Sequence, residues 1–276
     1  MQSVSVKYIL TWCFLFLLSS NVVFAQNTQW EHIRRIDIDN PDLISTDGRG
    51  NIYISDGKGI LRQFDPNGDS LNIYSPAFTS KLDKLECHWT VNIFLFSADL
   101  QRYELLDRFL NPLSSQQIQF PSSGIIKAVT LGNNHMLWFF DETGMSLKKM
   151  DYRRNQIVQE QPLGLVLPGS SLEIVDMSER KNMLFLQVRN EGVYIFDNQG
   201  NFIKQTGMPL KNPKVIENNH MYGIHSGHIL KTNYLTGDSL EIALPDASYG
   251  SLALSKDRVI LSKKGQVDIF VRPSDL

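Results

Sequence analysis

Six short, strongly apolar runs recur along this 276-residue chain at nearly constant spacing. The runs begin at Ile52, Ile93, Leu137, Leu184, Met221 and Arg258, so successive starts lie 41, 44, 47, 37 and 37 residues apart. Their β-branched and aromatic residues are typical of β-strands, and repetition at this period indicates similar supersecondary units placed side by side. Any fold proposed for the chain must therefore contain six related β-rich units.

The first unit, residues 42–74, displays the internal pattern most clearly. Three β-rich runs (residues 52–55, 60–64 and 70–74) are separated by Asp56-Gly57-Lys58-Gly59 and Pro66-Asn67-Gly68-Asp69. Glycine and asparagine at such places supply the positive φ that tight hairpin turns require. With residues 42–46 as a preceding strand, the unit is a four-stranded antiparallel meander of about 40 residues, the size of one propeller blade.

The predicted fold class is all-β: a six-bladed β-propeller of four-stranded antiparallel blades. Runs such as residues 94–96 and 138–140 are apolar on both faces, as expected of a sheet packed between two neighbouring sheets. No long apolar stripe of helical period follows the N-terminal leader in the sequence, so we expect essentially no helix there. The last unit has room for three strands, and we expect an N-terminal strand at about residues 30–39 to complete it and close the ring.

Residues 1–25 have the features of a secretory signal peptide. Lys7 provides the positive start, residues 8–18 form an apolar core, and Val23-Phe24-Ala25 forms a small-residue cleavage site. A membrane anchor fits less well, because this core is shorter than the roughly 20 residues that span a bilayer. We expect export to the periplasm or the extracellular space, a single β-propeller domain over residues 26–276, and no stable membrane insertion after cleavage.

The composition argues against two classes of partner. Cleavage would remove Lys7 from the 27 basic residues and leave 26 against 29 acidic residues, a balance that favours neither nucleic acid nor an anionic membrane. Cleavage would also leave Cys87 as the only cysteine, so the mature chain would contain no internal disulfide. We expect a monomer that is stabilised by its core and by closure of the ring.

The units at residues 52–74 and 193–205 resemble those of six-bladed β-propellers of the NHL-repeat, TolB-like and lactonase-like group. The resemblance covers the whole mature chain and looks most like exported propellers of Gram-negative bacteria. It implies the propeller fold together with lactone hydrolysis, lyase activity, or a binding or assembly role. Lactonase-like members hold calcium in the channel through carboxylates and amides, so calcium is the alternative to our expectation that the protein has no cofactor.

In a propeller, the turns between second and third strands share one face around the central channel, where ligands usually lie. We take the charged and imidazole side chains of these turns as candidate ligand-binding residues: Asp56, Lys58, Asp99, Asp141, Glu142, Arg189, Glu191, His225, His228, Lys263 and Lys264. The alternative is that these turns are polar because they contact water. We expect no metal site at the histidines, because His220 is predicted on the opposite face and the other two would need a third ligand.

Two hypotheses for function remain. The chain contains neither a Gly-x-Ser-x-Gly elbow nor a His-Glu-x-x-His motif, so serine-hydrolase and zinc-protease functions lack their signatures. The first hypothesis is a non-catalytic exported propeller that binds a protein, peptide or glycan on its loop face. The second is a lactonase- or lyase-like enzyme in which channel carboxylates such as Asp141 or Glu142 hold a divalent cation. No residue is assigned a catalytic role.

Overall fold

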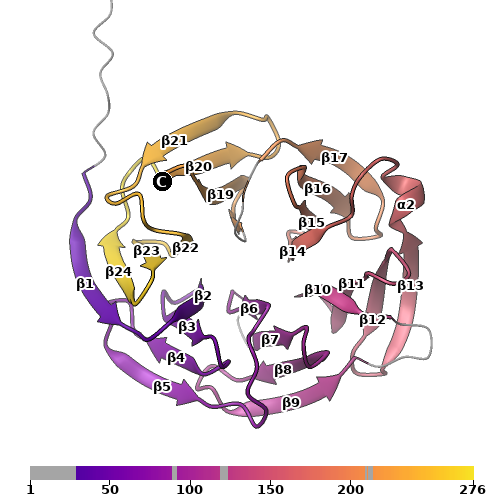
Figure 1. Cartoon of the computed structure of the whole chain (residues 1–276), viewed down its shortest axis with the longest axis horizontal. Helices are drawn as coiled ribbons and strands as arrows, with labels where there is room; N and C mark the ends of the chain where they lie inside the picture. Colours follow the sequence, from indigo (N-terminus) through magenta and orange to yellow (C-terminus); the bar gives the residue numbers. More distant parts are fainter. Residues whose placement is uncertain (1–28, 89–91, 119–123, 209, 211–213) are drawn as a thin grey trace, which may run out of the picture.

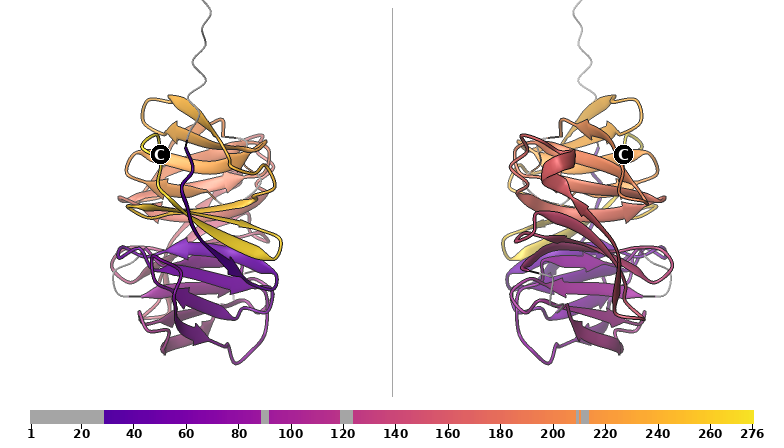
Figure 2. Two further views of the ribbon diagram at one scale, coloured as in Figure 1. Left: turned by 90° about the vertical axis from the view of Figure 1, so that its left-hand side faces the viewer. Right: turned by 90° about the vertical axis from the view of Figure 1, so that its right-hand side faces the viewer.

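The computed structural model describes residues 29–88, 92–118, 124–208, 210 and 214–276. The predicted signal peptide, residues 1–25, lies outside them. The described chain forms six four-stranded antiparallel sheets arranged in a ring (Figure 1). Side views show this ring as a flattened disc (Figure 2). The predicted six-bladed β-propeller is confirmed. Within the described residues, no helix is both long and apolar enough to cross a membrane.

Five blades follow one another along the chain, each with its strands in sequence order. The first and second blades consist of β2 (Pro41–Thr46), β3 (Ile52–Asp56), β4 (Leu61–Phe64) and β5 (Ser70–Tyr74), then β6 (Lys84–Glu86), β7 (Ile93–Ser97), β8 (Arg102–Leu106) and β9 (Pro112–Gln117). The third and fourth consist of β10 (Ile126–Leu131), β11 (Met136–Asp141), β12 (Ser146–Asp151) and β13 (Gln156–Pro162), then β14 (Ile174–Arg180), β15 (Met183–Val188), β16 (Gly192–Asp197) and β17 (Phe202–Thr206). The fifth consists of β18 (Val215–Glu217), β19 (His220–His225), β20 (His228–Asn233) and β21 (Ser239–Ala243).

The sixth blade joins the two ends of the described chain. Its inner strands are β22 (Ser251–Leu254), β23 (Arg258–Lys263) and β24 (Gln266–Val271), and its outer strand is β1 (His32–Asp37). β1 runs antiparallel to β24, with Ile36 opposite Val267. The predicted closing strand is therefore confirmed. It satisfies the backbone groups that β24 would otherwise expose as a sheet edge.

The second strands of the blades form the core because both of their faces are buried. Every residue of β3 and β7 is buried, as the two-sided apolar pattern predicted. The apolar clusters lie between blades: Phe94 and Phe96 of β7 pack with Leu137 and Phe139 of β11. Fully burying one such side chain contributes about 2 kcal/mol, so contacts between neighbouring blades stabilise the ring.

Outside the sheets, the described residues form one short helix, α2 (Leu163–Val166), which connects the third blade to the fourth. We expected essentially no helix after the leader, and this single turn is the departure from that expectation. It forms where residues 163–167 leave the outer strand, and the amide of Leu167 donates to the carbonyl of Leu163 at 2.8 Å. Leu163 is buried in the core cluster between the third and fourth blades, so tertiary packing holds a turn that is too short to be stable alone.

Candidate functional site

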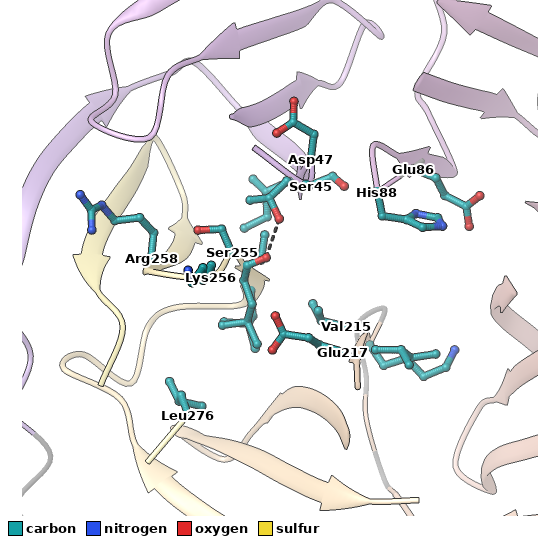
Figure 3. A pocket seen from close by; sticks show the side chains of 18 of the residues that line it. Ser45, Asp47, Glu86, His88, Val215, Glu217, Ser255, Lys256, Arg258 and Leu276 are labelled. Carbon is teal, nitrogen blue, oxygen red and sulfur yellow. Dashed lines mark hydrogen bonds between the residues drawn. The ribbon is translucent and has the colours of Figure 1, made fainter. Parts of the chain in front are cut away.

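The inner strands of the ring enclose a cavity of about 840 Å³. Its lining extends from these strands to the turns that connect first and second strands, which lie on one face of the disc. Asp47, His88, Glu217 and Lys256 come from four different blades and surround this cavity (Figure 3). The volume lies in the range of roughly 300–1,000 Å³ that is typical of ligand pockets.

A second cavity, of about 380 Å³, lies toward the opposite face, where the inner strands begin. Asp42, Lys81 and Arg189 contribute to its lining. Leu43, Asp83, Lys84 and Asp176 line both cavities and therefore lie near the middle of the channel.

Asp176, in β14, is the centre of a buried ion network. Lys84 Nζ lies 2.6 Å from Oδ1 and Lys214 Nζ lies 2.9 Å from Oδ2. Burial raises the pKa of Asp176, but the two ammonium groups outweigh it and lower the pKa below its ordinary value. For Lys214, burial is the larger effect and lowers the pKa, although Asp176 opposes it. The network joins the second, fourth and fifth blades across the channel.

Arg180, at the end of β14, lies beside His88. Its Nη1 is 2.6 Å from His88 Nε2 and 2.9 Å from the carbonyl oxygen of Glu179. A guanidinium can only donate, so His88 Nε2 is the acceptor. Burial, followed by the charges of Arg180 and Lys84, lowers the pKa of His88 well below its ordinary value, and the imidazole is neutral.

Glu86 provides the second buried carboxylate of the channel. It accepts from Thr130 Oγ1 at 2.7 Å and from the backbone amide of Leu131 at 3.0 Å. It also lies 3.4 Å from Lys84 Nζ. Asp176 and Glu86, the two buried carboxylates of this lining, are thus engaged by groups of the protein.

The candidate residues predicted from the sequence lie at the turns between second and third strands, on the face opposite the large cavity. Arg189 lines the smaller channel cavity, and Lys264 lines a separate pocket of about 320 Å³ beside Gly57. The other nine candidates line neither channel cavity. The fold places the set on one face but spreads it around six blades.

Asp56 stabilises its own turn. Its Oδ1 accepts from the amides of Lys58 at 2.9 Å and Ile60 at 3.0 Å, and its Oδ2 accepts from Arg62 at 3.2 Å. The same pairing of an aspartate with the amides two and four residues later recurs at Asp47, Asp65, Asp107 and Asp197. The side chains of Lys58 and Asp99 are exposed in their turns.

Asp141 is buried and paired. Its carboxylate accepts from the amide of Gly124 at 3.0 Å and from Lys148 Nζ at 2.9 Å. Burial raises the pKa of Asp141, but these hydrogen bonds outweigh that effect and lower it. Glu142 is exposed and lies 3.5 Å from Lys127.

Glu191 holds the loop that follows α2. It accepts from Ser170 Oγ, the amide of Ser171 and Tyr194 Oη, each at 2.7 Å. Burial alone would raise the pKa of Glu191, yet these donors lower it to about 2. Its neighbour Arg189 forms an ion pair with Glu173.

His225 and His228 pair with each other across the turn from β19 to β20. Lys263 Nζ lies 2.6 Å from Asp246, whereas Lys264 is exposed. In the part of the chain that the structure describes, no group of three or more His, Cys, Asp or Glu residues is placed to hold a metal ion.

The sequence-based search missed the polar residues of the channel. They occupy alternate positions at the inner strands, as Lys84, Glu86 and His88 and as Asp176, Ser178 and Arg180. Alternate residues of a strand point to the same side, so charged residues at every second position of a first strand were the available signal.

The calcium alternative requires carboxylates that are free to bind a cation. Lysine ammonium groups already pair with Asp176 in the channel and with Asp141 at the opposite face. These cations would repel a divalent ion at either carboxylate, so the two groups do not fit a calcium site.

No protein-family model matches the chain, and no curated protein matches its sequence. Several solved structures have a similar fold. A β-propeller domain of Cps50 (Swd1) from Myceliophteria thermophila superposes with a TM-score of 0.63 at 8% identity, covering 88% of this chain and 100% of that one. The WD40 domain of Neurospora crassa Pan2 gives 0.58 at 9% identity, covering 91% and 98%.

A streptogramin B lyase structure gives a TM-score of 0.57 at 13% identity, covering 91% of this chain and 90% of that one. At such low identity these similarities demonstrate the β-propeller fold, and function must be argued from the residues of the site.

Proposed function

We propose that this protein is a non-catalytic, exported binding propeller that receives part of a protein, peptide or glycan in the 840 Å³ channel cavity. The observation that carries the proposal is a preformed cavity bordered by side chains of several blades, among them the charged residues Asp47, Glu86 and Glu217. Domains of this architecture in WD40 proteins are interaction scaffolds, which supports a binding role. The candidate residues predicted from the sequence lie on the opposite face, where Asp56, Asp141 and Glu191 accept hydrogen bonds from groups of their own turns and loops.

The mouth of the cavity can be blocked without straining the backbone. Gly48 lines the cavity, and a Cβ built there meets no atom within 4 Å. Gly57 lies on the opposite face of the same blade, and its Cβ position is equally open. Gly48→Trp should therefore obstruct the channel mouth, and Gly57→Trp is the matched control for a new surface tryptophan.

The test compares the two variants with the wild-type protein on peptide and glycan arrays. We expect Gly48→Trp to abolish binding of any ligand that the wild-type protein retains, and Gly57→Trp to keep it. Loss in Gly57→Trp with retention in Gly48→Trp would move the site to the opposite face. Turnover of simple lactones by the purified protein would replace the binding function with an enzymatic one.

A further inference from the structure

Three basic side chains meet in the wall of the large cavity. Lys84, Arg180 and Lys214 come from the second, fourth and fifth blades. The side chain of Lys214 is fully buried, and that of Lys84 is 11% exposed. Burying a charge is costly unless an opposite charge compensates it, so the surrounding acids decide what the cluster can bind.

Carboxylates pair directly with two of the three cations. Asp176 pairs with both lysines, and Glu86 approaches Lys84. Within the described residues, Arg180 forms no ion pair with a carboxylate, and its hydrogen-bond partners are the neutral His88 ring and the backbone carbonyl of Glu179. Arg180 is therefore the cation of this cluster that no carboxylate contacts directly, although Glu86, Asp176 and Glu179 act on it through space.

Glu179, next to Arg180 in the chain, does not pair directly with its guanidinium. Successive side chains of a strand point to opposite sides, and Glu179 lies between the blades, where it accepts from the amide of Asn133 at 3.3 Å. Burial raises the pKa of Glu179.

Some N–H donors of the Arg180 guanidinium make no hydrogen bond to the described residues. Only Nη1 makes hydrogen bonds to the described residues, which leaves Nε and Nη2. A planar guanidinium fork matches the two oxygens of a carboxylate, and charge-assisted bonds of this kind are about twice as strong as neutral ones.

We propose that the channel contains a carboxylate-binding subsite, with Arg180 as the principal partner and Lys84 and Lys214 as supporting positive charges. The inference deepens the proposed function by naming the chemical group that the channel recognises. That group belongs either to a free organic acid or to the carboxyl terminus of a peptide.

Glutarate is the probe, with dimethyl glutarate as its neutral counterpart, and binding is followed by calorimetry and thermal shift. We expect saturable one-to-one binding of glutarate and none of the diester. Arg180→Gln should weaken glutarate binding at least tenfold, because a charge-assisted pair is lost. Arg258→Gln removes the same charge from the same cavity lining, where Arg258 contacts Pro66 and Asn67, and should change the affinity less than threefold.

Three outcomes would overturn the subsite: no saturable glutarate binding, equal binding of the diester, or equal loss in Arg180→Gln and Arg258→Gln. Arg180→Lys, which keeps the charge, should bind with intermediate affinity, and the melting curve of each variant verifies its folding. A short peptide and its C-terminal amide then separate the two sources of the carboxylate. If Gly48→Trp abolishes binding of an array ligand but Arg180→Gln does not change the affinity for glutarate, the subsite is wrong and the binding function stands. If Arg180→Gln weakens glutarate binding but Gly48→Trp does not affect the array ligand, the subsite stands and the proposed binding function is wrong.

Discussion

At the residue scale, the charged side chains of this propeller divide into turn supports and channel groups. Asp56 and its four counterparts bind backbone amides, which explains why aspartate recurs in the repeat. Their regularity made them visible in the sequence. Asp176 and Arg180 do not recur, and their partners Lys84, Lys214 and His88 lie far away in the chain, so their pairing depends on closure of the ring.

Asp176→Asn should destabilise the protein by about 3–5 kcal/mol, because it leaves two buried lysines without their carboxylate. Urea unfolding monitored by tryptophan fluorescence measures the change. Glu142→Gln removes one exposed negative charge and should change stability by less than about 0.5 kcal/mol. Equal effects of the two substitutions would contradict the network.

Asp268 should make stability dependent on pH. Burial opposes its ionisation, but Tyr249, His32, Gln266 and Arg35 donate to it and lower the pKa of Asp268 to about 2. Because the folded pKa lies below the unfolded value, the stabilisation is complete above about pH 5 and is lost as the pH falls toward 2.

The wild-type protein should exceed Asp268→Asn in stability by on the order of 1–2 kcal/mol at pH 7, and the difference should shrink at pH 2.5. Urea titrations at both pH values provide the measurement. A difference that stays constant between them would exclude the carboxylate as its origin.

At the element scale, the sequence predicted most of what the structure contains. All six second strands lie where the apolar runs placed them, because burial on both faces leaves an unambiguous pattern. The divergent turns of the second and third blades were harder to recognise, since Leu110 and Asn155 take the positive φ there that glycine takes at Gly68. The short helix α2 depends on packing of Leu163 and has no periodic signal.

Deletion of residues 30–39 should open the ring. It removes β1, exposes the edge of β24 and leaves Phe270 without its edge contact to Trp30, whose ring centroid lies 5.4 Å away. Loss of several buried apolar contacts at about 1–2 kcal/mol each should lower the melting temperature by roughly 10 °C.

A synthetic peptide of residues 29–40, added in trans, should restore part of the lost stability by pairing with β24, as other peptides extend open sheet edges. Differential scanning calorimetry of both samples is the measurement. An unchanged melting temperature after the deletion would show that β1 does not hold the ring closed.

At the scale of the whole molecule, the buried ion pairs of the channel connect parts of the chain that are far apart in the sequence. The sequence correctly indicated a propeller, but the location of the cavity depends on which inner-strand side chains leave space at the centre. That property arises only when six blades are assembled, so the pattern of one blade cannot reveal it.

Calcium should leave the melting temperature unchanged, because lysines already neutralise Asp176 and Asp141. Thermal shift in millimolar calcium, with chelator as the control, tests this expectation. A rise that saturates at one equivalent would instead support the lactonase-like alternative.

Closure by β1 also has a kinetic consequence. His32 pairs with Phe270, so the sixth blade cannot be completed until β24 has been synthesised. Contacts of such large sequence separation slow folding. Five blades must form and remain folded before β1 can pair with β24 and close the ring. A circular permutant that joins β1 directly to β24 and begins at another blade boundary would make this contact local, and it should refold faster than the natural order.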